Sequence, residues 1–230
     1  MDSEQRHQLW KFARGDAKIP DFEQWLYSAK GLEKSLGDDL YLSLISCDFS
    51  GRDETWAIRK TLAELLQIQE NCECPGIKDL AAIPMGGDFY SETIFKSLET
   101  VAEFGRDKWW LYISKCKICR ELWMVAQDDR IYDDFFLNRI DEVALGNARL
   151  GIWPDVFLTY ESVLAFGRKL SSPPRFLEPL AYSLQWTVED LQKERPEISG
   201  GEIANLLGLT PGHAAKLVRY VKTYGTDKLE

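Results

Sequence analysis

Apolar residues recur at a spacing of three or four positions through residues 1–70. That spacing places them on one face of a helix, where they can be buried against a neighbouring element. The run 40–47 suits either a strand or a buried helix, and leucines four residues apart favour the helix. The sequence therefore predicts an N-terminal helical region over residues 1–70. Its pattern-forming positions are Leu9, Phe12, Phe22, Trp25, Leu26, Leu36, Leu40, Leu44, Trp56, Ile58, Leu62, Leu65 and Leu66.

The pattern changes in residues 71–145, which begin with a cysteine-rich turn. Apolar positions in 91–104 keep helical spacing and predict one more helix. Two runs rich in β-branched and aromatic residues, 109–114 and 121–127, flank a short loop and predict a β-hairpin. The apolar residues 135–137 suit a helix or a strand. We therefore expect a mixed region here.

Residues 146–195 predict helical segments joined by loops, and the charged, proline-containing stretch 194–197 marks a plausible boundary before a module at 196–230. In that module Ala204 would allow two helices to approach closely, and Gly208 supplies a positive-φ turn. Thr210 and Pro211 suit the cap and first turn of the second helix. This arrangement resembles a helix-turn-helix.

The predicted fold class is thus mainly α (α+β). It is a helical protein with a small zinc-ribbon-like β-hairpin and a C-terminal helix-turn-helix-like module.

Composition narrows the functional classes. The chain has 230 residues, of which 45% are hydrophobic, and eight tryptophans, which is ample for a buried core. A net charge of -9 weighs against a broad surface for nucleic acid. The segment 1–7 lacks the apolar core of a signal peptide, and no apolar run approaches the roughly 20 residues that span a bilayer. We therefore expect a cytoplasmic protein with no membrane partner.

Cys116 and Cys119 occupy the tip of the predicted hairpin, with two residues between them. Zinc ribbons hold the ion with such knuckles. The other close pair is Cys72 and Cys74, and 41 residues separate Cys74 from Cys116. The chain has only two histidines, far away in sequence, so the simplest complete site uses Cys72, Cys74, Cys116 and Cys119. Four thiolates leave no position for water, which predicts a structural zinc rather than a catalytic one.

Other readings of the cysteines stay open at this point. The thiols could be free and buried, the site could be incomplete, the ion could be iron, or Cys116 and Cys119 could form a redox dithiol. A thioredoxin-like dithiol opens a helix, whereas a strand is predicted after Cys119, which weighs against redox work. Cys47 lies in an apolar stretch and is expected in the core.

Catalytic groups are scarce. The two histidines are His7 and His213, and the sequence has neither Gly-x-Ser-x-Gly nor His-Glu-x-x-His. The adjacent acidic pairs 38–39, 128–129 and 133–134 are expected on the solvated surface. The sequence therefore predicts a protein that is not an enzyme.

One further pattern covers residues 10–66. It consists of Phe-x-x-Gly at 12–15, Phe-Glu-x-Trp at 22–25 and Leu-Gly-x-x-x-Tyr at 36–41, before an apolar helix. This segment resembles the opening of the small helical immunity-type proteins that are encoded beside bacterial toxins. The resemblance implies that the chain neutralises a toxin, with an acidic surface that engages a basic partner. It carries over no individual site residues.

The leading hypothesis is a non-enzymatic, zinc-stabilised bacterial protein that binds another protein. The specific role it suggests is immunity to a toxin. The alternative is a helix-turn-helix transcriptional regulator with a structural zinc. Against that alternative, the first turn of the second helix offers Pro211, Gly212 and His213, which can read few base edges. Lys216, Arg219 and Lys222 would then contact phosphates.

Overall fold

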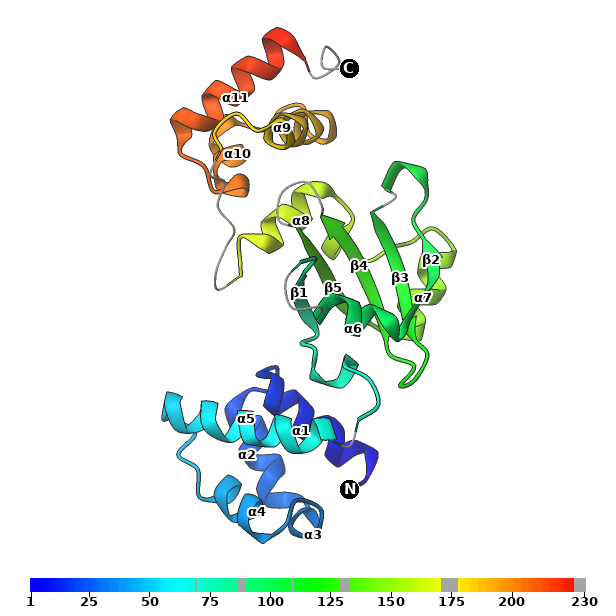
Figure 1. The fold of residues 1–230 in the computed structure, drawn as a ribbon, viewed down its shortest axis with the longest axis vertical. Coiled ribbons are helices and arrows are strands. Elements are labelled where there is room, and N and C mark those ends of the chain that lie inside the picture. Colours follow the sequence, from blue (N-terminus) through cyan, green and yellow to red (C-terminus); the bar gives the residue numbers. More distant parts are fainter. Residues whose placement is uncertain (69, 87–89, 109, 129–132, 171–177, 226–230) are drawn as a thin grey trace.

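The computed structural model describes residues 1–230 except 69, 87–89, 109, 129–132, 171–177 and 226–230. Helices α1–α5 lie at one end, an antiparallel sheet lies in the middle, and α9–α11 lie at the other end (Figure 1). The helices are α1 Ser3–Arg14, α2 Ile19–Ser28, α3 Leu32–Leu36, α4 Asp38–Ile45, α5 Arg52–Ile68, α6 Tyr90–Lys96, α7 Glu142–Arg149, α8 Tyr160–Gly167, α9 Tyr182–Glu194, α10 Gly200–Leu207 and α11 Pro211–Tyr224. The strands are β1 Leu80–Pro84, β2 Leu98–Glu103, β3 Leu111–Cys116, β4 Leu122–Asp128 and β5 Asp134–Ile140, and short 3-10 turns include η1 Cys74–Gly76.

Helices α1–α5 form an N-terminal helical unit with a core of its own, as the spacing of apolar residues predicts. The Asp2 side chain caps α1 by accepting from the backbone N–H of Gln5, and the Gln5 side chain accepts from the backbone N–H of Asp2. In the core, the rings of Phe12 and Phe22 stack with centroids 3.9 Å apart, and Phe49 meets both edge-on. The run 40–47 is helical where α4 covers it.

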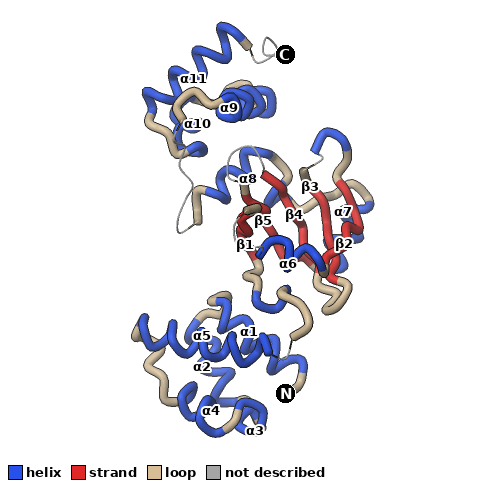
Figure 2. The backbone as a smooth tube through the Cα atoms, in the orientation of Figure 1, coloured by secondary structure: helices blue, strands red, loops and turns tan. Residues whose placement is uncertain are grey.

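The sheet holds five described strands in the order β1-β5-β4-β3-β2, and every neighbouring pair is antiparallel (Figure 2). Its central strand β4 alternates between two cores. Leu122 and Met124 face α7, α8 and the C-terminal helices, whereas Trp123 and Val125 face α6 and the cysteine turn. Because both faces of β4 are covered, the strand is a continuous apolar run.

The predicted hairpin exists as β3 and β4, but the expectation of a small, ribbon-like hairpin was wrong. β3 and β4 lie inside the larger sheet, with β2 and β5 on their outer sides. The residues 135–137 lie in β5, which settles their assignment as strand. Antiparallel partners far apart in sequence complete the sheet, and apolar periodicity within one segment does not reveal them.

The prediction of one helix over 91–104 was also wrong. Helix α6 ends at Lys96, and the rest of the segment forms β2, which pairs with β3. The register shifts between Thr100 and Ala102, so the strand carries a bulge there. A bulge interrupts the two-residue alternation of a strand. Leu98 and Val101 are therefore three residues apart without a helical turn between them.

Helices α9–α11 pack together at the C-terminal end, and the predicted pair of helices around Gly208 is confirmed as α10 and α11. Ser199 caps α10, Thr210 caps α11, and Gly208 has a φ of 65° at the turn between them. Ala204 is buried at the approach of the helices. Among the described helices, none combines the length and the apolar character needed to cross a lipid bilayer.

The acidic residues at the end of β4 and the start of β5 differ from the surface expectation. Asp128 is only 1% exposed, and its Oδ1 accepts a hydrogen bond of 3.1 Å from the Tyr160 hydroxyl. Asp134 pairs with it across the strands. Burial, together with the charges of Asp128 and Asp133, raises the pKa of Asp134 to about 6. Of the predicted acidic pairs, residue 129 lies outside the described residues.

The raised pKa of Asp134 predicts a pH-dependent loss of stability. The unfolded carboxyl titrates near 3.9, so the folded chain loses stability as pH rises from about 4 to about 6, which is the pKa of Asp134 in the fold. Asp134→Asn should therefore raise the free energy of unfolding at pH 7.5 by up to about 1 kcal/mol after solvent screening, and by less at pH 5. Urea unfolding at both pH values measures this difference, with the exposed Glu103→Gln as control. An equal gain at both pH values would contradict the assignment.

Candidate metal centre

The structure brings together the four cysteines that the sequence analysis selected. The sulfur atoms of Cys72, Cys74, Cys116 and Cys119 all lie within 4.8 Å of one another. Cys72 lies in the turn after α5, and Cys74 opens η1. Cys116 ends β3, and Cys119 lies in the turn that leads into β4. Two chain segments that are distant in sequence thus meet at one cluster of sulfurs.

The dimensions and the burial of this cluster suit a metal ion. Four sulfurs bound to zinc at about 2.3 Å form a tetrahedron with edges of about 3.8 Å. The observed upper limit of 4.8 Å is therefore close to a binding geometry. Cys72, Cys74 and Cys116 are buried, and Cys119 is half-buried. All five cysteines lie within the described residues and carry free thiols, and Cys47 packs beside the N-terminal core instead.

The turn after β3 has the local geometry of a metal knuckle. The Cys116 N–H donates to the Glu121 carbonyl at 2.8 Å, and the Arg120 N–H donates to the Cys116 carbonyl at 3.1 Å. Arg120 closes the turn with a φ of 69°. The chain then continues into β4 and not into a helix, as predicted. In a thioredoxin-like site a helix begins at the dithiol, whereas a strand follows it here. The turn therefore favours metal binding over that redox chemistry.

Backbone amides point at the sulfurs and prepare them for a cation. Burial opposes ionisation of Cys116, but N–H groups of Cys119 and Ile118 donate to its sulfur and lower its pKa to about 7. Burial and a hydrogen bond with Cys119 raise the pKa of Cys72 to about 12. The pKa of Cys119 is also raised, first by its hydrogen bond with Cys74. Without a cation one thiolate is favoured beside thiols that resist ionisation, and a bound metal would displace their protons.

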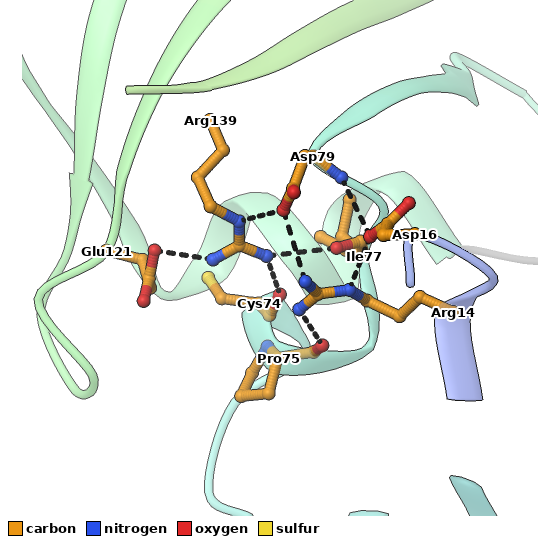
Figure 3. A network of polar contacts seen from close by, with 8 residues as sticks. All are labelled: Arg14, Asp16, Cys74, Pro75, Ile77, Asp79, Glu121 and Arg139. Atoms are coloured by element: carbon orange, nitrogen blue, oxygen red, sulfur yellow. Dashed lines mark hydrogen bonds and ion pairs between the residues drawn. The ribbon is translucent and has the colours of Figure 1, made fainter. Parts of the chain in front are cut away.

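Arg139 of β5 fixes the backbone that carries Cys74 (Figure 3). Its guanidinium donates to the carbonyl of Cys74 and to that of Ile77, each at 3.0 Å. It also donates to Asp79 at 2.8 Å and to Glu121 beside the knuckle. One side chain thereby holds both cysteine segments in place.

Arg14, at the end of α1, joins the same network (Figure 3). Its side chain donates to the Pro75 carbonyl at 2.8 Å, to Asp79 at 3.1 Å and to Asp16 at 2.8 Å. Asp79 therefore bridges two guanidinium groups, one from the N-terminal helical unit and one from the sheet. The network ties this unit to the metal centre.

Sequence reasoning missed Arg14, Asp79 and Arg139. Their contacts span 60 to 65 positions in the chain. No local signal in the sequence identified them. In the structure Arg14 is buried at the end of α1, and a buried arginine requires partners.

Comparisons with protein-family models, with curated proteins and with solved structures find no match for this chain. The chemistry of the centre must therefore be argued from its own donors. Four sulfurs complete a tetrahedral shell, so an ion here would have no open position for water or substrate. Such a centre stabilises a fold and does not activate a substrate.

Arg139→Gln tests the network around the centre. The change removes the guanidinium that serves Asp79, Glu121 and two carbonyls, so it should lower the free energy of unfolding by about 2–4 kcal/mol. Metal affinity should fall by roughly 10- to 100-fold, because second-shell groups orient the ligands. Urea unfolding and competition with a chromogenic chelator measure the two effects. The matched control is Arg219→Gln on the exposed face of α11, and equal behaviour of the two variants would refute the role of Arg139.

Proposed function

We propose that Cys72, Cys74, Cys116 and Cys119 bind one structural zinc ion. The convergence of the four sulfurs supports this assignment. Zinc suits a shell of four thiolates, and its ligands here would come from two turns that are distant in sequence. The ion would then fasten the cysteine turn after α5 to the β3–β4 hairpin. Iron in the same shell is the other metal that fits the donors.

Cys116→Ser tests the zinc assignment. We expect one zinc per chain in the parent protein by elemental analysis, no absorption bands of iron–thiolate centres, and loss of the metal in the variant. The variant should also unfold at a much lower temperature, since structural zinc sites contribute folding free energy outright. Cys47→Ser, outside the cluster, is the matched control. A metal-free parent protein, purified reduced and without chelators, would rule the proposal out.

We further propose that the chain acts by binding another protein and is not an enzyme, with toxin immunity as its named role. Three features support this proposal: the closed ligand shell, the net charge of -9, and the resemblance of residues 10–66 to immunity-type proteins. The N-terminal helical unit also exposes large side chains of the type that anchor interfaces. Among them are Tyr27 and Trp56, which are 64% and 65% exposed. An acidic surface would attract a basic toxin.

A DNA-binding role for α10 and α11 is the second candidate. The exposed face of α11 carries Lys216, Arg219 and Lys222, which suits contact with phosphates. At the first turn, however, a ring nitrogen of His213 is hydrogen-bonded to the Pro179 carbonyl. The side chain best placed to reach a base is therefore already engaged within the fold, which favours the protein-binding proposal.

Co-expression distinguishes the two roles. We expect the chain to co-purify with the basic protein encoded by a neighbouring gene and to restore growth of cells that produce this protein. Rescue should be lost with Cys116→Ser and kept with Cys47→Ser, because it requires the folded chain. Absence of both complex and rescue would refute immunity. Binding of the full chain to duplex DNA, weakening steeply with salt, would instead support the regulator.

A further inference from the structure

An open pocket of about 490 Å³ lies in the N-terminal helical unit, away from the cysteines. One face of α5 lines it with Arg52, Thr55, Trp56 and Arg59, which follow the i, i+3, i+4, i+7 spacing of neighbours on a helix. Phe49 contributes to the wall. The two guanidinium groups face a single lining carboxylate, that of Asp53. In a chain with a net charge of -9, this pocket is locally basic.

Arg59 is held in place without a charged partner. Its guanidinium lies over the ring of Phe12, with the central carbon 4.9 Å from the ring centroid. Its Nε atom is buried and has no hydrogen-bond acceptor, and within the described residues no carboxylate lies close enough to form an ion pair. Asp16, the nearest acidic influence, accepts from Arg14 instead. Burial lowers the pKa of Arg59 despite Asp16.

Two other arginines that are withdrawn from solvent show what is missing here. Buried Arg14 and half-buried Arg139 each donate to several oxygens around the cysteine cluster. Arg59 is half-buried with its Nε atom out of contact with solvent, but that atom lacks such acceptors. A partly desolvated guanidinium without an acceptor is costly, and a bound anion would remove that cost.

Trp56 lies one helical turn from both arginines and is 65% exposed beside the pocket. An exposed tryptophan next to a concave site offers a flat apolar surface for a ligand ring or an aliphatic side chain. Tryptophan and arginine are also the residues most enriched at the energetic centres of protein interfaces. The pocket therefore combines an apolar platform with an anion site.

We propose that this pocket binds a carboxylate carried beside an aromatic or large aliphatic group, presented by an acidic, apolar segment of the protein partner. The carboxylate would accept from the planar guanidinium of Arg59, and the apolar group would pack on Trp56. Arg52, one end of the same face, would attract the negative charge of the segment. This inference rests on the proposed protein-binding function and names the surface that carries it.

A small matched pair of probes tests the pocket on the full, metal-loaded chain. N-acetylphenylalanine carries the carboxylate and the ring, and N-acetylphenylalanine amide carries the ring alone. In a two-dimensional ¹H–¹⁵N NMR titration we expect the acid to shift the Arg59 Nε–H and Trp56 indole signals with a Kd in the millimolar range, and the amide to bind at least about tenfold more weakly. Phenyl phosphate is a third arm that distinguishes a carboxylate site from a phosphate site.

Arg59→Gln should weaken binding of the acid at least about tenfold, while Arg219→Gln leaves it unchanged. The thermal midpoint of Arg59→Gln should stay the same or rise, because the variant no longer withdraws the Arg59 Nε–H from solvent without an acceptor. A purely structural arginine would lower the midpoint and leave the binding of the probe intact. Arg59→Lys keeps the charge without the fork and should bind with intermediate affinity.

Any one of four outcomes would overturn the inference. The acid and the amide could bind with equal affinity, or phenyl phosphate could bind more tightly than the acid. The Arg59→Gln variant could bind the acid as tightly as the parent protein, or no probe could give a saturable shift. Because the titration uses no partner protein, a failed co-expression experiment with a saturable titration would refute immunity and leave the pocket standing. The reverse result would refute the pocket alone.

Discussion

The junction between the helical unit and the sheet depends on burying a group of sulfurs without leaving their charge unbalanced. With a divalent ion bound, four thiolates would carry two net negative charges, and three of the four cysteines are buried. Amide N–H groups at Cys116 and the guanidinium groups of Arg14 and Arg139 are the positive ends that face this region. Asp79 accepts from both arginines, and its negative charge offsets their mutual repulsion. Groups on α1, η1 and β5 thereby share in offsetting the free-energy cost of burying the sulfurs.

This arrangement explains why the junction is polar although it lies between two apolar cores. Within the described residues, the core of the N-terminal helical unit and the core that contains the cysteines are separate clusters of buried side chains. The turn after α5 connects the two cores. Its carbonyls accept hydrogen bonds from Arg14 on one side and from Arg139 on the other (Figure 3). Directional bonds fix an orientation that apolar contact alone would leave loose. The position of one unit on the other is therefore set by charge and geometry.

The parts of the fold that sequence reasoning predicted are those whose causes are local. Helix α5 is encoded in its own leucine spacing, and Thr210 and Gly208 mark the start of α11 from within a few residues. The knuckle at Cys116 and Cys119 is equally local. The convergence of the other two cysteines was inferred by counting thiols against the four donors that a zinc site requires, and the four sulfurs do lie together.

The parts that were missed depend on distant partners. Strand β1 pairs with β5, with partners 50 to 58 positions apart, and the bulge in β2 gives that strand a helix-like spacing of apolar residues. Arg139 was not predicted either, because an arginine in a strand reads as a solvated side chain until its acceptors are known. Arg59 was missed for the opposite reason, because acceptors are missing around it and not present. Its spacing from Arg52 and Trp56 is visible in the sequence, but its significance depends on which carboxylates are absent from its surroundings.

The contrast between Arg59 and the two arginines of the junction separates scaffold from recognition. Arg14 and Arg139 donate to groups of their own chain, so their charges serve the fold. The guanidinium of Arg59 lies over the ring of Phe12, but its Nε–H has no acceptor. A fold that satisfies the guanidinium groups of Arg14 and Arg139, and leaves the Arg59 Nε–H without an acceptor beside an exposed Trp56, loses stability at that point. Such a local loss of stability is expected where binding, and not packing, determines the residue, and the hydrogen-bonded junction supplies the rigidity that presents it.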